Sequence, residues 1–152
     1  WKTEKLIERI KQHPQLNKRL FMFNDLSDRE LEYCYSHSRA LVFPSYVEGF
    51  GLPLVEAMQR GLPAMASDIP VFREIGGDSM AYFGLSEPES LCRLVRRFEG
   101  SGQFPAPISL DNWSWLSWSD SAMQLIGRVQ GQTKRQQAAR ASIKSNADYG
   151  RP

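Results

Sequence analysis

The sequence predicts an α/β fold in which helices cover both faces of a parallel sheet. Short apolar runs alternate with helix-period patterns along most of the chain. Turn and capping signals bound these runs, as they do around buried strands. Strands that alternate with helices at this spacing pair in parallel, and such sheets bind ligands beyond the carboxyl ends of their strands. Four strands are expected, at Leu20–Phe23, Ala40–Phe43, Pro63–Ala66 and Met80–Phe83.

Helix signals fill the segments between these runs. Two of the helices open on a capping box, with Ser27 and Glu30 in the first and Ser86 and Glu89 in the second. The helices therefore connect successive strands, as a parallel sheet requires. The helical patterns cover residues 2–13, 27–35 and 53–61, a short stretch ending at 75, a stretch from 86 to 98 and a last one ending near 129.

Length and charge narrow the classes of function. The 152 residues, 41% hydrophobic and 24% charged, are typical of one soluble globular domain. The net charge of +2 is uneven, because residues 128–152 carry six basic side chains and one acidic side chain. The remaining body is mildly acidic, which argues against a nucleic-acid partner. Residues 130–152 are predicted to form a basic, flexible tail that is solvated, and the alternative is contact between this tail and an anionic membrane surface.

Cysteine content and hydropathy bear on the cellular compartment. Cys34 and Cys92 are too few and too far apart for a disulfide framework or a zinc site, so we expect free thiols. No apolar run approaches the ~20 residues of a membrane span, and no secretory signal opens the chain. We therefore expect a cytoplasmic protein, at the inner face of the membrane if the tail binds lipid. Because the chain begins at Trp1, we also expect it to be a piece of a longer polypeptide.

The loop from Pro44 to Ala57 is the strongest candidate for a functional site. It follows a predicted buried strand and leads into a helix, and its glycines Gly49 and Gly51 allow a ligand to approach the backbone closely. The unpaired amides at the start of that helix, together with the helix dipole, are suited to an anion such as a diphosphate.

Two carboxylates, Glu48 and Glu56, frame the loop. Ionised carboxylates only accept hydrogen bonds, and their paired oxygens match the vicinal hydroxyls of a ribose or hexose. Each also has a purely structural explanation: Glu56 can stabilise its own helix dipole, and Glu48 can be a solvated loop charge. The spacing of the two favours a site for a nucleotide sugar.

The residues from Glu48 to Met58, Glu-Gly-Phe-Gly-Leu-Pro-Leu-Val-Glu-Ala-Met, resemble the signature of a known family. They are similar to the retaining GT-B glycosyltransferases of the large glycogen-synthase-like group, known as glycosyltransferase family 4 or group 1. This resemblance covers the chain except its tail, and it implies the C-terminal, Rossmann-like half of a GT-B fold. The matching segments outside the signature are Leu26–Asp28, Gly61–Pro63, Ala66–Pro70, Phe72–Ile75 and Trp115–Trp118.

The resemblance implies that residues 1–129 form the nucleotide-sugar (donor) binding domain, lacking its first strand. Glu48 would be the catalytic contact to hydroxyls of the transferred sugar, and Glu56 would bind the ribose. The diphosphate and donor sugar would be held by Gly49, Phe50, Gly51 and Leu52, and the base by Asn24, Asp25 and Leu26.

The resemblance also implies a mechanism without a metal or other cofactor. The acceptor attacks from the face that the diphosphate leaves, and a departing phosphate oxygen takes the acceptor's proton, so Glu48 is not a nucleophile. Neither Lys2 nor Lys5 matches the Arg and Lys that neutralise the diphosphate in the family. We therefore expect these cations, and an N-terminal domain that binds a glycan or lipid-linked acceptor, to lie upstream. On this basis the 152 residues alone would be inactive and would bind the donor weakly.

The amino-acid sequences of segments 68–74 and 115–118 resemble those of O-antigen mannosyltransferases. The favoured substrate is therefore GDP-mannose, with a surface polysaccharide or lipopolysaccharide as acceptor. Two alternatives stay open: a glucosyl- or galactosyltransferase that uses a UDP-sugar, and a non-catalytic nucleotide-binding module of the same fold.

Overall fold

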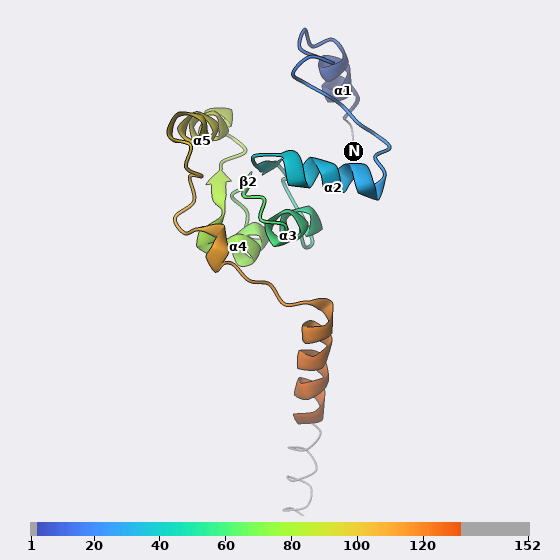
Figure 1. Cartoon of the computed structure of the whole chain (residues 1–152), viewed down its shortest axis with the longest axis vertical. Helices are drawn as coiled ribbons and strands as arrows, with labels where there is room; N and C mark the ends of the chain where they lie inside the picture. Colours follow the sequence, from blue (N-terminus) through green and yellow to red (C-terminus); the bar gives the residue numbers. More distant parts are fainter. Residues whose placement is uncertain (1–2, 132–152) are drawn as a thin grey trace, which may run out of the picture. The chain divides into compact units, whose positions relative to one another are not determined.

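A computed structural model describes residues 3–131 of the chain (Figure 1). The chain divides between Asp111 and Asn112 into two compact units. The predicted basic tail lies outside the described residues, except for Gln130 and Gly131, which are helical. No helix among the described residues is long and apolar enough to cross a membrane.

The first unit is built on a parallel sheet of three strands. The strands are β1 (Leu41–Phe43), β2 (Ala64–Ser67) and β3 (Ala81–Phe83), in the spatial order β1-β2-β3. Both neighbouring pairs are parallel, with Val42 opposite Met65 and Ala66 opposite Tyr82. The predicted α/β, Rossmann-like fold class is therefore confirmed, with one strand fewer than expected among the described residues.

The helices lie at the predicted places, with ends shifted by a few residues. In the second unit residues 118–131 are helical, and Trp113 and Trp115 stack on each other ahead of this helix with ring centroids 6.4 Å apart. The helices of the first unit are α1 (Glu4–Lys11), α2 (Asp28–His37), α3 (Leu52–Gln59), α4 (Pro70–Gly76) and α5 (Pro88–Ser101).

Helices cover both faces of the sheet. On one face, the rings of Phe43 on β1 and Phe72 on α4 lie 5.5 Å apart, and Leu41 packs against a cluster that joins α2 and α3. On the other face, the apolar side chains of α5 pack on β2 and β3. The residues of this second cluster are Met65, Ala81 and Phe83 on the strands, with Leu91, Leu94 and Phe98 on the helix.

The prediction of a strand at Leu20–Phe23 is wrong. The segment has no regular structure, and the pairing found there is an isolated bridge between Leu16 and Leu20. A strand exists only where a neighbour completes its backbone hydrogen bonds, and no described strand lies beside this segment. Phe21 and Phe23 are instead exposed and stack with their ring planes 8° apart.

One of the two predicted capping boxes forms. Ser27 caps α2: its side chain accepts from the Glu30 amide, while the Glu30 carboxylate accepts from the Ser27 amide. Hydrogen bonds from Ser27 lower the pKa of Glu30. The box predicted at Ser86 is wrong, because Pro88 occupies the first position of α5 and its N-cap is Glu87, without a side-chain cap.

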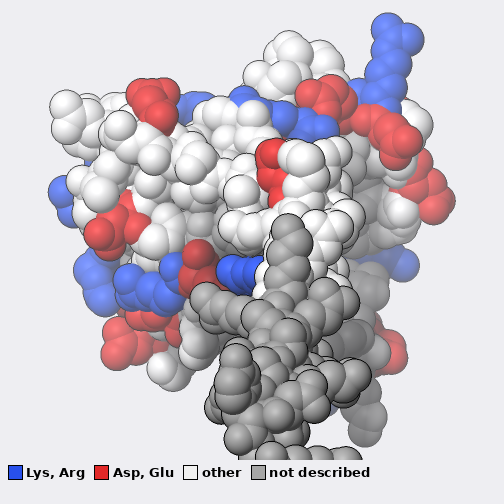
Figure 2. Space-filling view, turned by 90° about the horizontal axis from the view of Figure 1, so that it is seen from below, with Lys and Arg blue, Asp and Glu red and all other residues white. Residues whose placement is uncertain are grey.

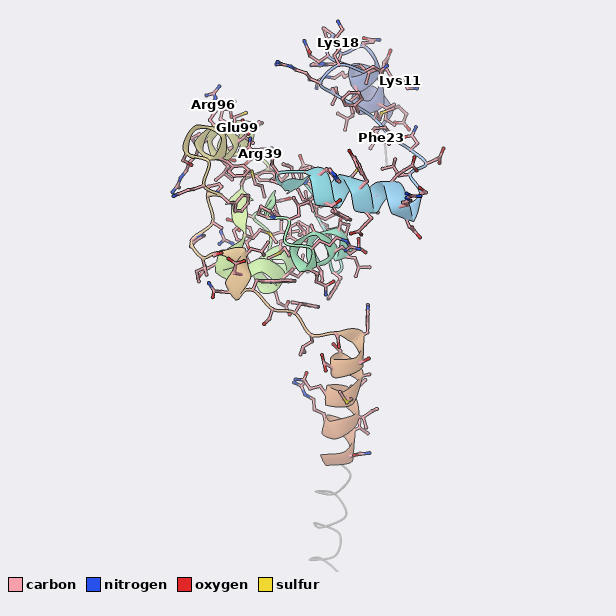
Figure 3. All side chains as sticks on the ribbon, viewed as in Figure 1. Lys11, Lys18, Phe23, Arg39, Arg96 and Glu99 are labelled. Atoms are coloured by element: carbon pink, nitrogen blue, oxygen red, sulfur yellow. The ribbon has the colours of Figure 1, made fainter. Side chains whose placement is uncertain are left out.

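Surface charges of both signs surround this core. Figure 2 shows basic and acidic side chains interspersed with uncharged ones on the visible face. One exposed pair joins the segment before β1 to α5: Arg39 donates to Glu99 over 2.6 Å, and its guanidinium lies 4.7 Å from the ring centroid of Phe98 (Figure 3). Exposed ion pairs contribute about 0–1 kcal/mol, so burial of apolar residues contributes most of the stability.

Candidate functional site

The candidate site lies at the carboxyl end of β1, where residues 44–51 lead into α3. This loop is tied to the sheet by Ser67, a fully buried residue at the end of β2. The Ser67 hydroxyl lies 3.2 Å from the Phe43 carbonyl oxygen and 2.7 Å from that of Ser45. The start of the loop is therefore fixed by the neighbouring strand.

Glu48 is held by the residue at the start of the same loop. Ser45 Oγ donates to Glu48 Oε1 over 2.8 Å, in a partly buried contact. Between them, Tyr46 and Val47 are 71% and 74% exposed. Within the described residues, Glu48 Oε2 makes no hydrogen bond, so one oxygen of this carboxylate is available to a ligand.

The two glycines of the loop have different surroundings. Gly51 has φ +86°, and a Cβ there would lie 2.8 Å from the Phe72 ring. A Cβ at Gly49 would meet no atom within 4 Å. Gly51 is therefore required by the fold itself, because of both its backbone conformation and its packing. Gly49 faces open space, where a ligand can approach the backbone.

The N-terminus of α3 presents free amides beside these glycines. The amides of Leu54 and Val55 donate to the carbonyl oxygen of Gly51, and Pro53 has no amide hydrogen. No hydrogen bond in the described part of the chain uses the amide of Gly51 or Leu52. Free amides at the positive end of a helix dipole attract an anion, and Leu52 is 48% exposed.

Glu56 projects from α3 toward α2. The hydroxyl of Tyr35 on α2 donates to Glu56 Oε2 over 3.2 Å. Arg60 lies beside this pair, and its guanidinium donates to the backbone oxygen of Glu56 over 2.9 Å. Glu56 Oε1 makes no hydrogen bond within the described residues. The two carboxylates thus have the same arrangement. In each, a hydroxyl donates to one oxygen, and the other oxygen makes no hydrogen bond within the described residues.

The residues predicted to bind a base lie in the loop that leads into α2. Asn24, Asp25 and Leu26 are all exposed, and within the described residues they make no hydrogen bond to Glu48 or Glu56. This loop does not follow a strand, since the strand predicted at 20–23 is absent.

Asp68, which directly follows β2, forms an ion pair with Arg73 on α4. The Arg73 guanidinium donates two hydrogen bonds to the Asp68 carboxylate, at 2.7 and 2.8 Å. These bonds lower the pKa of Asp68 and raise that of Arg73. Arg73 also lies 3.9 Å from the ring centroid of Tyr82, and burial raises the pKa of Tyr82 to about 12. Arg73 therefore has a structural role.

Sequence reasoning missed three residues that hold the site, namely Tyr35, Ser45 and Ser67. The position of Ser45, three residues before Glu48 in the same loop, was the available signal. Tyr35 and Ser67 act across 21 and 22 residues of sequence, and only the folded chain reveals such contacts.

Groups that could bind a metal are absent from the part of the chain that the structure describes: no three His, Cys, Asp or Glu side chains gather there. Cys34 and Cys92 are both free, as predicted, with Cys34 partly buried and Cys92 exposed.

An α/β domain with free helix amides behind a glycine loop and a carboxylate on either side has the layout of a phosphate- and sugar-binding domain. The chain belongs to the family of glycosyl transferases group 1, whose family model matches residues 1–102. This match confirms the resemblance given by the signature from Glu48 to Met58.

Curated relatives lie within the same class. The chain is 41% identical over 126 residues to the serotype-specific mannosyltransferase WbdA of Escherichia coli, a match covering 83% of this chain and 16% of WbdA. It is 32% identical over 121 residues to the O-antigen chain mannosyltransferase RfbU of Salmonella typhimurium, covering 79% of this chain and 33% of RfbU. The chain therefore spans less than two thirds of these relatives. No solved structure gives a significant match.

Proposed function

We propose that the chain is the donor-binding part of a retaining glycosyltransferase that moves mannose from GDP-mannose to a surface polysaccharide or lipopolysaccharide. Family membership supports the class of reaction. The similarity to WbdA and RfbU, both of them mannosyltransferases, supports mannose as the sugar. The observation that carries the proposal is the pair Glu48 and Glu56, each with one carboxylate oxygen held by a hydroxyl and the other available.

Each part of the donor then has a proposed place. The diphosphate takes the free amides of Gly51 and Leu52 at the start of α3 and passes over the open backbone at Gly49. Glu56 accepts from the ribose hydroxyls, and Glu48 from hydroxyls of the transferred mannose. Phe50, in the same loop, is 39% exposed. The base lies against the exposed loop formed by Asn24, Asp25 and Leu26.

The transfer itself needs no covalent bond to the protein in this proposal. The bond from the anomeric carbon to the diphosphate oxygen breaks, and the acceptor hydroxyl oxygen bonds to the same face of that carbon. The hydroxyl proton passes to the departing phosphate oxygen. Glu48 and Glu56 position the donor, and the helix amides stabilise the charge that grows on the leaving diphosphate. Two carboxylates near a diphosphate also call for cations, which we propose come from outside this segment.

The test is a titration of the intact protein with GDP, GDP-mannose, UDP-glucose and UDP-galactose. We expect GDP and GDP-mannose to bind selectively. Glu56→Gln should weaken both by about tenfold, since each has the ribose, whereas Glu48→Gln should weaken GDP-mannose alone. Glu74→Gln changes another exposed carboxylate and should leave both affinities unchanged.

Other outcomes separate the alternatives. Selective binding of a UDP-sugar would replace mannose and GDP in the proposal but keep the site. Nucleotide binding without transfer of labelled mannose to a polysaccharide acceptor would indicate a non-catalytic module. Binding that is indifferent to both Glu48→Gln and Glu56→Gln would refute the proposed site.

A further inference from the structure

Tyr35 is a buried titratable group that the proposed function does not use. It lies near the end of α2, is 8% exposed, and packs in a cluster with Ala57 and Leu62. Its hydroxyl donates to Glu56 Oε2 over 3.2 Å. Glu56 lies on α3, the helix next to α2 in Figure 1. The hydrogen bond thus joins a buried ring to a partly exposed carboxylate.

The Tyr35 ring is held in place by charged groups as well as by the core. The guanidinium of Arg60 lies 5.1 Å from its centroid. Arg60 is itself fixed by Glu32 on α2, over 2.6 Å, and by the backbone oxygen of Glu56. A ring packed against apolar residues and a fixed cation keeps one rotamer, so its hydroxyl has a fixed position.

The hydroxyl also keeps its proton. Burial and the nearby Glu56 carboxylate raise the pKa of Tyr35, so the group remains a hydrogen-bond donor at neutral pH. A permanent donor on Oε2 restricts the rotation of the Glu56 carboxylate. Oε1 is then presented in one orientation before any ligand arrives, which lowers the ordering cost of binding.

We propose that Tyr35 is a positioning residue that orients Glu56 toward the ribose hydroxyls of the nucleotide. This inference rests on the proposed function, because it takes Glu56 as the ribose contact. It assigns to α2 a part in donor recognition that residues 44–56 do not provide by themselves. The competing explanation is that the bond only ties α2 to α3, in which case its loss would not depend on the ligand's sugar.

The test uses the intact protein and matched nucleotides with and without ribose hydroxyls: GDP, UDP and ADP, each beside its 2′,3′-dideoxy analogue. Tyr35→Phe removes the hydroxyl and keeps the ring, so the core packing is retained. We expect this variant to bind the preferred ribonucleotide about threefold to tenfold more weakly, with the affinity for the dideoxy form unchanged. Tyr33→Phe is the matched control, because Tyr33 lies on the same helix with 62% exposure.

A double variant makes the test independent of fold stability. Tyr35→Phe added to Glu56→Gln should cost no further affinity if Tyr35 acts through Glu56. Equal weakening of the ribose and dideoxy forms by Tyr35→Phe, or no weakening of either, would overturn the inference while a sensitive Glu56→Gln leaves the proposed function standing. A wild-type protein that binds the two forms equally would overturn the proposed function and this inference together.

Discussion

The segment from Ser45 to Met58 has two ends that are built differently. At the helical end, Leu54 and Ala57 have no exposed surface, and Gly51 packs against Phe72, which is also fully buried. At the loop end, the residues from Ser45 to Gly49 are partly or largely exposed, and the space around Gly49 is open.

Stability and ligand binding are therefore assigned to different ends of one short motif. The helical end is fixed by the core, so the amides at the start of α3 hold their direction without a ligand. The loop end is more exposed, and it is held by Ser67 and by the bond from Ser45 to Glu48. A substitution at the helical end should therefore change the free energy of unfolding, and one at the loop end should change ligand affinity.

The largest expected effect is at Phe72. Phe72→Ala removes a fully buried ring that contacts both Phe43 and Gly51. We expect it to lower the free energy of unfolding by about 3–5 kcal/mol, the usual cost of such a cavity. Urea denaturation measures this, with Phe21→Ala as the control, because Phe21 is 56% exposed. Similar losses for the two variants would contradict the buried role of the helical end.

The next effect is expected for Gly51→Ala. Alanine at φ +86° is strained, and its Cβ would lie 2.8 Å from the Phe72 ring. Together these should cost about 2–4 kcal/mol in the free energy of unfolding. Combining the change with Phe72→Ala separates the two causes: the steric part should vanish in the double variant, and the backbone part should remain. Fully additive losses would exclude the contact with Phe72 as a cause.

A smaller effect is expected where the loop end is joined to the sheet. Ser67→Ala removes the buried hydroxyl that faces the carbonyl oxygens of Phe43 and Ser45. Leaving these oxygens without that donor should lower the free energy of unfolding by about 1–3 kcal/mol. The same variant should weaken GDP-mannose binding, because the start of the loop loses its attachment. Unchanged affinity in a destabilised variant would show that the loop is fixed by other contacts.

Much of the architecture could be predicted from the sequence, because its signals are local. The strands β1, β2 and β3 are apolar runs between turn residues, and the capping box at Ser27 and Glu30 needs only its own four residues. The Leu20–Phe23 segment has the same local character as the true strands. It fails as a strand because pairing depends on a neighbour, which its own composition cannot reveal.

The candidate site shows the same limit. The glycines and carboxylates of the loop were visible as a pattern, yet the pattern treated Gly49 and Gly51 alike. They differ because Gly51 has a positive φ and packs against Phe72, a residue on another helix, and Gly49 does neither. Likewise Tyr35, whose hydroxyl donates to Glu56, reaches it only when α2 packs on α3. Contacts between distant segments therefore decide which residues of a recognised motif serve the fold and which are left for a ligand.

Gly49→Ala is expected to have the smallest effect on stability and is the sharpest test of the comparison. Gly49 does not have a positive φ, and an added methyl group meets no atom within 4 Å. The free energy of unfolding should therefore change by no more than about 0.5 kcal/mol. The same methyl group would stand where the diphosphate is proposed to pass the backbone. We expect GDP-mannose binding to weaken by about tenfold, because a misfit of this size costs about 1–3 kcal/mol.

The matched control for this last prediction is Gly100→Ala on α5, where an added Cβ also meets no atom within 4 Å. Gly100→Ala should leave GDP-mannose affinity unchanged, and alanine at a helical position should not destabilise the chain. If Gly49→Ala lowered stability without lowering affinity, the loop end would serve the fold and not ligand binding, which contradicts the comparison. Loss of affinity at unchanged stability would mean that the open space at Gly49 is occupied by the ligand, because within the described residues the methyl group touches nothing else.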